Sequence, residues 1–266
     1  MAVGSVHTDA PSDRTWSALY ADGAFTYPAT PTPTNGMGGQ GYLYDVSCTS
    51  TTWCAAVGHY FDPQSGVQGL LLEWNGRTWK RVENGPTASR YLESIDCVSK
   101  RHCVLASAKE RVLMQLRQWT PRGWFRIAVA DDARTMTPEG LDCLTLSSCM
   151  VTGFDASTNP EAGAVLRTTG RESHRGAMPS SPATFVFNDV SCQHDGTCWA
   201  VGGTETKYAR GAVAGISPTD KVRVTVPYIP QPYGTVLMAV CGPRCVAVGQ
   251  GASADVTLEP YAVIAR

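Results

Sequence analysis

The chain of 266 residues carries 22 basic and 23 acidic side chains, which gives a formal net charge of −1. A charge so nearly balanced provides no long-range field to attract nucleic acid or an anionic membrane surface, so we expect neither as a partner. No apolar run reaches the roughly 18 residues of a transmembrane helix. The first residues also lack the basic and apolar regions of a signal peptide, so we expect a mature form.

The chain begins with a strand, a long loop and a group of four strands. Residues 14–22 have a strand pattern, whereas residues 23–41 are rich in proline and glycine, which is typical of a loop. The turn Asn75-Gly76 is a hairpin signal, because glycine accepts a positive φ. Around this turn the pattern predicts strands over residues 43–48, 54–58, 69–74 and 78–82.

Close variants of this four-strand unit occur five times. Each copy has a strand that ends in cysteine, a short spacer and a second strand of the type Cys-x-Ala-Val-Gly, most clearly at residues 188–192 and 198–202. The first cysteines of successive copies are 46 to 49 residues apart, the length of a four-stranded propeller blade. The sequence therefore predicts an all-β fold, a five-bladed β-propeller, as a single domain over residues 1–266.

The fifth copy ends after its third strand, at residues 256–266, and no residues remain for a fourth strand. The N-terminal run of residues 14–19 matches residues 77–82, which lie in the fourth strand of the first copy. We therefore expect residues 14–22 to complete the last blade, so that the N-terminal strand closes the ring and hides its open edges. We also expect the protein to be a monomer.

The ten cysteines form five pairs, one in each repeat. Zinc binding, redox chemistry and disulfides are the three alternatives, and the absence of a Cys-x-x-Cys spacing counts against the first two. Each pair flanks a short polar turn between β-patterned segments, which places its Cα atoms near bridging distance. We therefore expect one disulfide per blade and a secreted or extracytoplasmic protein. The predicted pairs are Cys48–Cys54, Cys97–Cys103, Cys143–Cys149, Cys192–Cys198 and Cys241–Cys245.

The cysteine motif of the first copy is followed by Trp-Asn-Gly-x-x-Trp at residues 74–79. With these motifs, residues 42–266 resemble the actinobacterial secreted β-propeller repeat family, although copies three to five lack the paired hairpin tryptophans. The resemblance implies a β-propeller with a disulfide across the first hairpin of each blade. It implies no shared activity, because propellers host lectins, hydrolases, lyases and docking platforms.

The predicted functional face carries the loops that vary in length between copies. Just past its second strand, the first copy has His59, which could act as a general base or bind a ligand, where the others have Ala, Phe, Gly and Gln. The carboxylates Asp45, Asp189 and Glu161 are the candidates for acid–base catalysis. The alternative for the first two is that they hydrogen-bond the backbone of neighbouring blades. Loop side chains suited to sugars or peptides are Tyr60, Arg90, Tyr91, Arg134, Tyr208, Arg210 and Tyr233.

The leading hypothesis is an extracellular binding protein for a carbohydrate, peptide or small-molecule ligand, because no cofactor motif, metal cluster or catalytic signature is present. We expect no cofactor and no metal. The rival is an enzyme with a single site at the channel mouth, either a glycoside hydrolase or lyase or a biosynthetic cyclase, which the asymmetry of the loops favours. A third alternative is an assembly platform. The hairpin tryptophans are expected to pack blade against blade.

Overall fold

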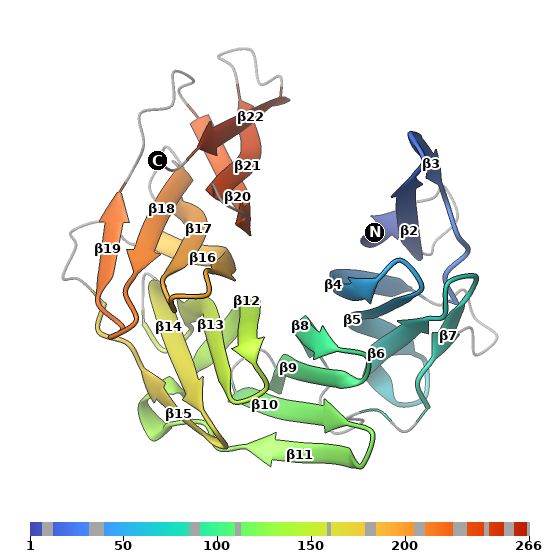
Figure 1. The fold of residues 1–266 in the computed structure, drawn as a ribbon, viewed down its shortest axis with the longest axis horizontal. Coiled ribbons are helices and arrows are strands. Elements are labelled where there is room, and N and C mark those ends of the chain that lie inside the picture. Colours follow the sequence, from blue (N-terminus) through green and yellow to red (C-terminus); the bar gives the residue numbers. More distant parts are fainter. Residues whose placement is uncertain are drawn as a thin grey trace. The chain divides into compact units, whose positions relative to one another are not determined.

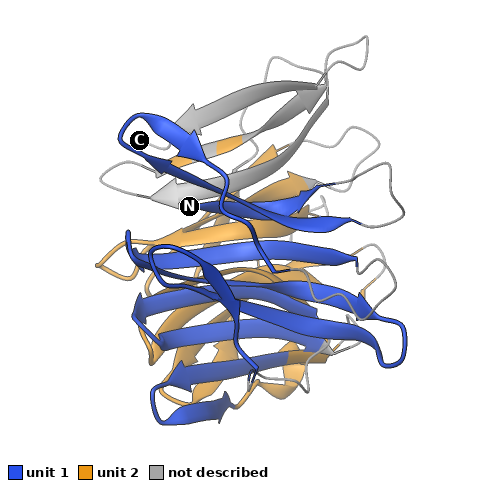
Figure 2. Ribbon diagram, turned by 90° about the vertical axis from the view of Figure 1, so that its right-hand side faces the viewer, with its two compact units in different colours: residues 1–111, 115–127 blue, residues 112–114, 128–266 orange. Residues whose placement is uncertain are grey.

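A computed structural model gives the structure of the chain (Figure 1). It describes residues 1–6, 13–31, 40–83, 85, 91–109, 113–158, 161–178, 185–204, 211–225, 233–241, 245–252 and 258–264. Beyond residue 224, side chains are described only at Val246 and Val248. The chain divides into two compact units, residues 1–111 with 115–127 and residues 112–114 with 128–266 (Figure 2).

Unit one contains an N-terminal sheet of order β1-β2-β3 and the four-stranded sheets of the first two repeats, β4-β5-β6-β7 and β8-β9-β10-β11. The strands of these sheets pair antiparallel: β1 with β2, β2 with β3, β4 to β7 in order, β8 with β9 and β10 with β11. The strands are β1 (Ala2–Val6), β2 (Arg14–Ala21), β3 (Ala24–Thr26), β4 (Gly41–Ser50), β5 (Trp53–Asp62), β6 (Gly66–Trp74), β7 (Trp79–Arg81), β8 (Tyr91–Ser99), β9 (His102–Lys109), β10 (Leu113–Thr120) and β11 (Gly123–Ile127).

Unit two contains the sheets of the other three repeats, β12-β13-β14-β15, β16-β17-β18-β19 and β20-β21-β22. A single turn of 3-10 helix, η1 (Asp131–Ala133), precedes them. The strands are β12 (Met136–Thr145), β13 (Ser148–Asp155), β14 (Ala162–Thr169), β15 (Glu172–Arg175), β16 (Phe185–Cys192), β17 (Cys198–Thr204), β18 (Gly211–Ile216), β19 (Val222–Thr225), β20 (Tyr233–Cys241), β21 (Cys245–Ala252) and β22 (Leu258–Ile264). The prediction that each repeat forms one antiparallel sheet is therefore confirmed.

The N-terminal segment forms a sheet of its own, which corrects the prediction. The turn between β2 and β3 lies at Asp22 and Gly23, whose positive φ angles of 53° and 79° suit a two-residue hairpin turn. Residues 24–26, expected within the long loop 23–41, therefore belong to β3. Since β2 pairs with β1 on one edge and β3 on the other, residues 14–22 do not supply the fourth strand of the last sheet. That sheet has three strands in the described part of the chain, and no sheet there closes on itself.

The strand β5 is buried on both faces, because each face packs against another sheet of unit one. Trp53 and Val57 lie in a cluster with Leu105 of β9, whereas Ala56 lies in a second cluster that Leu19 of the N-terminal sheet completes. Successive side chains of a strand point to opposite faces, so a strand with an apolar sheet on each face has buried side chains at every position. In unit two the sheets β12–β15 and β16–β19 share a comparable core.

Within each unit, a polar side chain on the first strand of one repeat ties its sheet to the next. In unit one, the Oγ atom of Ser47 on β4 accepts the backbone N–H of Cys97 on β8 at 3.0 Å. In unit two, the Oδ2 atom of Asp142 on β12 accepts the backbone N–H of Cys192 on β16 at 2.7 Å. Each acceptor directly precedes the first cysteine of its repeat, so the repeat motif itself encodes the connection.

Disulfides close the first hairpin of the first four repeats. The bonded cysteines are directly opposed in the hairpin registers, and their Cα atoms lie 3.9 to 4.0 Å apart. These four predicted disulfides are confirmed. In the fifth repeat, Cys241 and Cys245 are directly opposed in β20 and β21, but their side chains lie outside the described residues.

Three hairpin tryptophans, Trp74, Trp79 and Trp119, are buried, and Trp124 is half-buried. The Nε1 atom of Trp79 donates a hydrogen bond to the Oγ atom of Ser17 in the N-terminal sheet at 3.1 Å, and Trp74 packs against Trp79. Trp119 of the second repeat contacts Trp53 of the first, with ring centroids 6.3 Å apart. The prediction that these residues pack sheet against sheet is confirmed.

Candidate functional site

A β-bulge interrupts the first strand of every repeat at the same place. The Cα register between the first and second strands skips one residue on β4, β8, β12, β16 and β20. Bulges re-aim a side chain and are common beside active sites. The residues at this position are Tyr44, Glu93, Glu139, Asn188 and Val236. A repeated backbone feature therefore presents four kinds of side chain over the five repeats.

The glycine of the Cys-x-Ala-Val-Gly motif makes room for the bulge. A Cβ atom on Gly58 would lie 1.9 Å from the carbonyl oxygen of Tyr42, and one on Gly153 would lie 1.9 Å from that of Thr137. The same contact would be 1.8 Å at Gly202. No side chain fits at these distances, so the motif glycine allows the first strand to approach closely at the bulge.

Around the first bulge, three tyrosines surround His59. Tyr42 is the direct cross-strand partner of His59, and Tyr44 is the bulge residue on the same strand. Tyr91 comes from the beginning of β8. The centroid of the imidazole lies 5.1 Å from the ring of Tyr42, 5.3 Å from that of Tyr44 and 5.0 Å from that of Tyr91. We call these four residues the Tyr–His cluster.

Exposure within the Tyr–His cluster is graded. His59 is buried, with 8% of its surface exposed, whereas Tyr44 is 43% exposed. Tyr42 and Tyr91 are half-buried. The imidazole therefore lies at the base, and the tyrosine rings, Tyr44 above all, are the parts that a ligand would contact.

An acidic residue adjoins the cluster. The hydroxyl of Tyr42 donates a hydrogen bond to the Oδ2 atom of Asp13. This hydrogen bond, burial and the nearby negative charge all raise the pKa of the Tyr42 hydroxyl. The phenol is thus held protonated, and aromatic faces stand next to a polar group that can accept hydrogen bonds.

Asp45, predicted as a catalytic carboxylate, holds two strands together. Its Oδ1 atom accepts the N–H of Val46 at 2.7 Å, and its Oδ2 atom accepts the hydroxyl of Ser94 at 2.6 Å and the N–H of Ile95 at 2.8 Å. Burial raises the pKa of the Asp45 carboxyl above its usual value, although these hydrogen bonds act in the opposite direction. Because both oxygens bond to protein groups, the geometry supports the alternative role, a connection to the neighbouring sheet.

The other predicted carboxylates lie in unit two. The Oδ1 atom of Asp189 accepts the N–H of Val190 at 2.8 Å, as Asp45 does with its own successor. Gly140 takes the corresponding place in the third repeat, where an added Cβ would lie 2.6 Å from the Cα of Asp189. Glu161 is half-buried and directly precedes β14. Asp189 and Glu161 thus remain candidates, and both lie in unit two.

The predicted ligand-binding residues divide into several groups. Tyr91 belongs to the Tyr–His cluster, but Tyr60 points to the opposite face of β5, where it is buried and its hydroxyl accepts a hydrogen bond from Arg81 at 2.9 Å. Arg134 is exposed and pairs with Asp131 at 2.8 Å. Three of the predicted residues lie outside the described structure, namely Arg90, Tyr208 and Arg210. The backbone of Tyr233 is described, but its side chain is not.

A second polar group fixes the loop that follows β13. Asp155 is buried and accepts hydrogen bonds from Ser157 and Thr135, and its Oδ2 atom lies 2.8 Å from Nη1 of Arg175. Burial raises the pKa of the Asp155 carboxyl, but these hydrogen bonds outweigh it and hold the pKa well below its usual range. Asp155 is therefore an ionised anchor for the loop.

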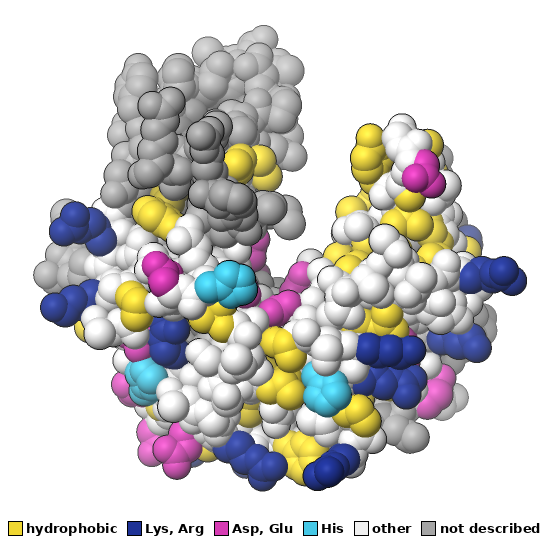
Figure 3. Space-filling view, viewed as in Figure 1, with side chains coloured by type: hydrophobic (Ala, Val, Ile, Leu, Met, Phe, Trp, Pro, Cys, Tyr) yellow, Lys and Arg dark blue, Asp and Glu magenta, His cyan; other side chains and the backbone are white. Residues whose placement is uncertain are grey.

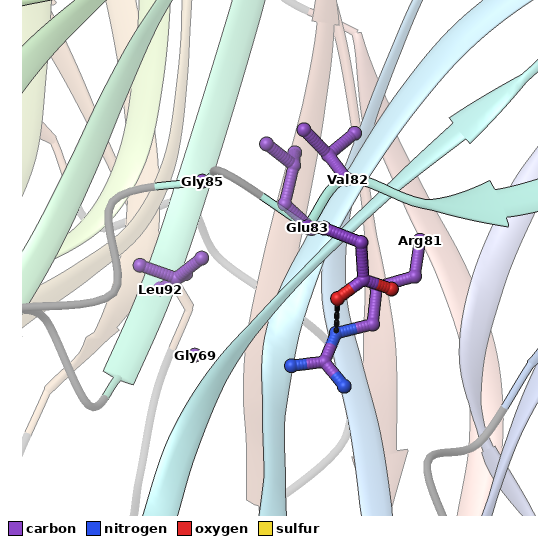
Figure 4. A pocket seen from close by; sticks show the side chains of 7 residues that line it. Gly69, Arg81, Val82, Glu83, Gly85 and Leu92 are labelled. Atoms are coloured by element: carbon purple, nitrogen blue, oxygen red, sulfur yellow. Dashed lines mark ion pairs between the residues drawn. The ribbon is translucent and has the colours of Figure 1, made fainter.

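A small pocket lies between the first two repeat sheets (Figure 4). It is lined by residues that include Gly69, Leu92 and the ion pair of Arg81 with Glu83, whose atoms are 3.9 Å apart. Its water-accessible volume of about 20 Å³ is room for about one water molecule. This pocket is too small for a sugar or a peptide side chain.

Charges are mixed over the face shown in Figure 3, where basic and acidic side chains are interspersed on the described surface.

In the part of the chain that the structure describes, no group of three or more His, Cys, Asp or Glu side chains is arranged to hold a metal ion. The described residues also include no helix long and apolar enough to cross a membrane.

No protein-family model matches the chain, and no curated protein matches it by sequence. Solved structures do match. YCF48 bound to D1 peptide matches with a TM-score of 0.56 at 11% identity, over 90% of this chain and 72% of that one. SapL1 lectin in complex with alpha methyl fucoside matches with a TM-score of 0.57 at 11% identity, over 99% of this chain and 94% of that one.

A fungal lectin from Aleuria aurantia, with a six-bladed propeller fold, matches with a TM-score of 0.56 at 8% identity, over 96% of this chain and 86% of that one. The chain has a β-propeller-like fold. Puromycin hydrolase matches with a TM-score of 0.59 at 13% identity, and the match covers 98% of this chain but 43% of that enzyme. At such low identities the similarity extends to the fold alone.

Sequence reasoning missed Tyr42 and Tyr44, which complete the site around His59. The signal that could have found them is the motif glycine. A glycine in a strand interior indicates a bulge or a close backbone approach, and Gly58 recurs as glycine in most copies. Gly58 faces the backbone of Tyr42, and the bulge residue Tyr44 lies two positions further along the same strand.

Proposed function

We propose that the protein is an extracellular ligand-binding propeller whose ligand is a carbohydrate or a peptide. The observation that carries this proposal is the Tyr–His cluster, in which a β-bulge presents the exposed ring of Tyr44 beside two half-buried tyrosines. Aromatic residues with a polar tip are suited to ligands that have both apolar faces and hydrogen-bonding groups.

The chemistry of the cluster fits sugars and peptides better than a charged small molecule. Tyrosine rings can stack on the C–H face of a sugar or on a planar peptide group, and the hydroxyls provide donors and acceptors. His59 and Asp13 supply further polar atoms close to these rings. The ligand would lie across Tyr44 and contact Tyr42 and Tyr91 at its edges.

For the enzyme alternative, the geometry bears on one of the candidate carboxylates. A glycoside hydrolase needs one carboxyl group to donate a proton and a second to act as base or nucleophile. Asp45 is one of the three candidate carboxylates, and its two oxygens accept three hydrogen bonds from Val46, Ser94 and Ile95. We infer that a carboxylate whose two oxygens both accept such hydrogen bonds connects β4 to β8 and does not act in catalysis.

The proposed architecture is a propeller in which the five repeat sheets are blades. The N-terminal sheet packs on the first repeat through Ser17 and Leu19, as one blade packs on the next, and we propose that it occupies a sixth position. In such a ring the five bulge residues would line the inner face. Their variety, with Tyr44 and Glu93 in adjacent blades, favours one unique site over five equivalent ones.

The proposed extracellular location rests on the disulfides. Four are formed, each across a six-residue separation, and structural disulfides are rare in reducing compartments. Mass measurement of protein purified from its native source, with and without thiol alkylation, would test this. Fully alkylated cysteines in the unreduced protein would contradict the location.

The function is tested by incubating the protein with panels of soluble cell-wall and plant polysaccharides and of peptides. Two quantities are recorded, namely the depletion of protein onto each ligand and the appearance of new product masses. We expect retention on one ligand class without new products. New products that disappear in a His59→Gln variant would instead establish an enzyme, and no retention on any ligand would refute the binding function for these classes.

A further inference from the structure

Two arginines face each other across the outer hairpin of the second repeat. Arg117 on β10 and Arg126 on β11 are direct cross-strand partners in the register. Residues so placed have Cβ atoms about 4.5 to 5.5 Å apart, and like charges on directly opposed residues destabilise the pairing. An isolated hairpin would therefore be more stable without this pair.

Nothing in the described structure compensates these two charges. Neither Arg117 nor Arg126 forms an ion pair or a hydrogen bond through its side chain among the described residues. The Nε atom of Arg117 is moreover excluded from solvent and has no acceptor. Water can therefore hydrate only part of this guanidinium, and an anion bound at its outer nitrogens would compensate its charge.

Two other arginines of the protein, the exposed Arg101 and the half-buried Arg167, do have carboxylate partners. Arg101 forms a bidentate pair with Glu73, and Arg167 pairs with Asp220. The Arg117–Arg126 pair differs from these residues because it combines two cations and lacks a carboxylate. The two guanidinium groups thus have no anionic partner among the described residues.

The neighbouring residues hold the two arginines in place. Two positions further along the same strands, Trp119 and Trp124 are the next cross-strand pair on this face, and their rings are stacked with centroids 5.3 Å apart and an angle of 10°. Trp119 is buried against the core of unit one. The stack fixes the register of the hairpin, so the two guanidinium groups start from a preorganised position.

We infer that Arg117 and Arg126 form an oxyanion-binding site, which accepts a carboxylate, sulfate or phosphate group between the two guanidinium groups. Guanidinium groups bind such oxygens through paired hydrogen bonds, and two of them provide enough donors for each oxygen of the anion. This site lies on β10 and β11, apart from the Tyr–His cluster on β4, β5 and β8, and does not depend on the function proposed there.

The test measures the melting temperature of the protein in sulfate and in chloride at equal, low ionic strength. We expect sulfate to raise the melting temperature of the native sequence by about 3 °C at ten times its dissociation constant. Arg117→Gln and Arg126→Gln should abolish the difference between the two salts. The matched control is Arg122→Gln in the turn of the same hairpin, which should keep the whole difference. An equal sulfate effect in all three variants would overturn the proposal.

A second measurement separates binding from folding. In chloride alone, Arg126→Gln and Arg126→Glu should melt at or above the native temperature, because they remove the like-charge repulsion. NMR of the arginine Nε–H groups should show a shift for Arg117 on addition of sulfate. An unshifted Arg117 signal, or a lower melting temperature for both variants in chloride, would contradict the assignment.

Further arms of the titration identify the source of the anion. Inorganic phosphate, glucuronate and a peptide rich in aspartate are compared with sulfate at the same concentration. A larger effect of glucuronate points to an acidic sugar, and a larger effect of the peptide points to a protein carboxylate. Absence of an Arg126-dependent effect for all four probes would refute the site.

Discussion

Replacing the motif glycine Gly153 by alanine tests the structural origin of the bulge. The added Cβ would lie 1.9 Å from the carbonyl oxygen of Thr137 and 3.2 Å from the backbone nitrogen of Glu139. Both neighbours are backbone atoms, so the strand β12 would have to move by more than 1 Å, an estimate based on ordinary contact distances of about 3.4 Å or more. The bulge that places Glu139 outside the ladder would be lost or displaced.

The expected cost combines two effects. Overpacking of this kind costs about 1 to 3 kcal/mol, and each displaced backbone hydrogen bond adds about 1 kcal/mol. We therefore expect Gly153→Ala to lower the free energy of unfolding by about 3 kcal/mol, which corresponds to a fall in melting temperature of about 6 to 12 °C. The control is Gly215→Ala on β18, where the added Cβ would meet only the ring of Trp199 at 3.6 Å, an ordinary contact.

Chemical unfolding of the oxidised proteins, followed by circular dichroism and tryptophan fluorescence, measures both changes. Gly215→Ala should stay within about 1 kcal/mol of the native stability, as expected for a strand substitution that makes no clash. A loss below about 1 kcal/mol for Gly153→Ala, or equal losses for the two variants, would refute the argument that close approach at the bulge requires glycine.

Three further predictions concern polar groups. Asp45→Asn should lower the free energy of unfolding by about 2 kcal/mol, because an amide nitrogen cannot accept the N–H groups, yet leave ligand affinity unchanged; a variant that folds normally and loses binding would contradict this. Glu73→Gln should cost about 1 kcal/mol in thermal unfolding, since it removes a bidentate pair with a half-exposed arginine, whereas no change would argue against that pair. The pKa of Asp155 is depressed in the folded state. Its contribution to stability is therefore present above the pKa of about 4 that the carboxyl has in the unfolded chain, and it is lost as the pH falls below that pKa. The stability difference between the native protein and Arg175→Met should therefore shrink in acid, and a constant difference from pH 7 to pH 3 would be inconsistent with this anchor.

The repeat architecture could be predicted from the sequence because its signals are local. Cysteine pairs, hairpin turns such as Asn75-Gly76 and strand alternation depend on residues close in the chain, and all of these yielded sheets at the predicted places. The N-terminal strand was misplaced because its similarity to residues 77–82 says what kind of strand it is, but not which edge it pairs with. The hairpin turn at Asp22 and Gly23, a local signal, decided that pairing.

The site was harder to predict because it depends on contacts between repeats. The sequence singled out His59 by comparison of the five copies, and the structure places it within a cluster. Its neighbour Tyr60 looked equivalent in sequence but faces the core, since adjacent residues of a strand point to opposite sides. Asp45 could be recognised as special, but its bonds to Ser94 and Ile95, about 50 residues away, which connect β4 to β8, could not be read from the sequence.

The most direct test of the binding function is calorimetric titration of the ligand found in the panel into three proteins, the native chain, Tyr44→Ala and Tyr20→Ala. Tyr20 is the matched control because it is an exposed tyrosine of the same unit, 60% exposed on β2, outside the Tyr–His cluster. Loss of one stacking ring should weaken binding by about tenfold for Tyr44→Ala, while Tyr20→Ala binds as the native chain does. Equal affinities of all three proteins would contradict a ligand site at the Tyr–His cluster.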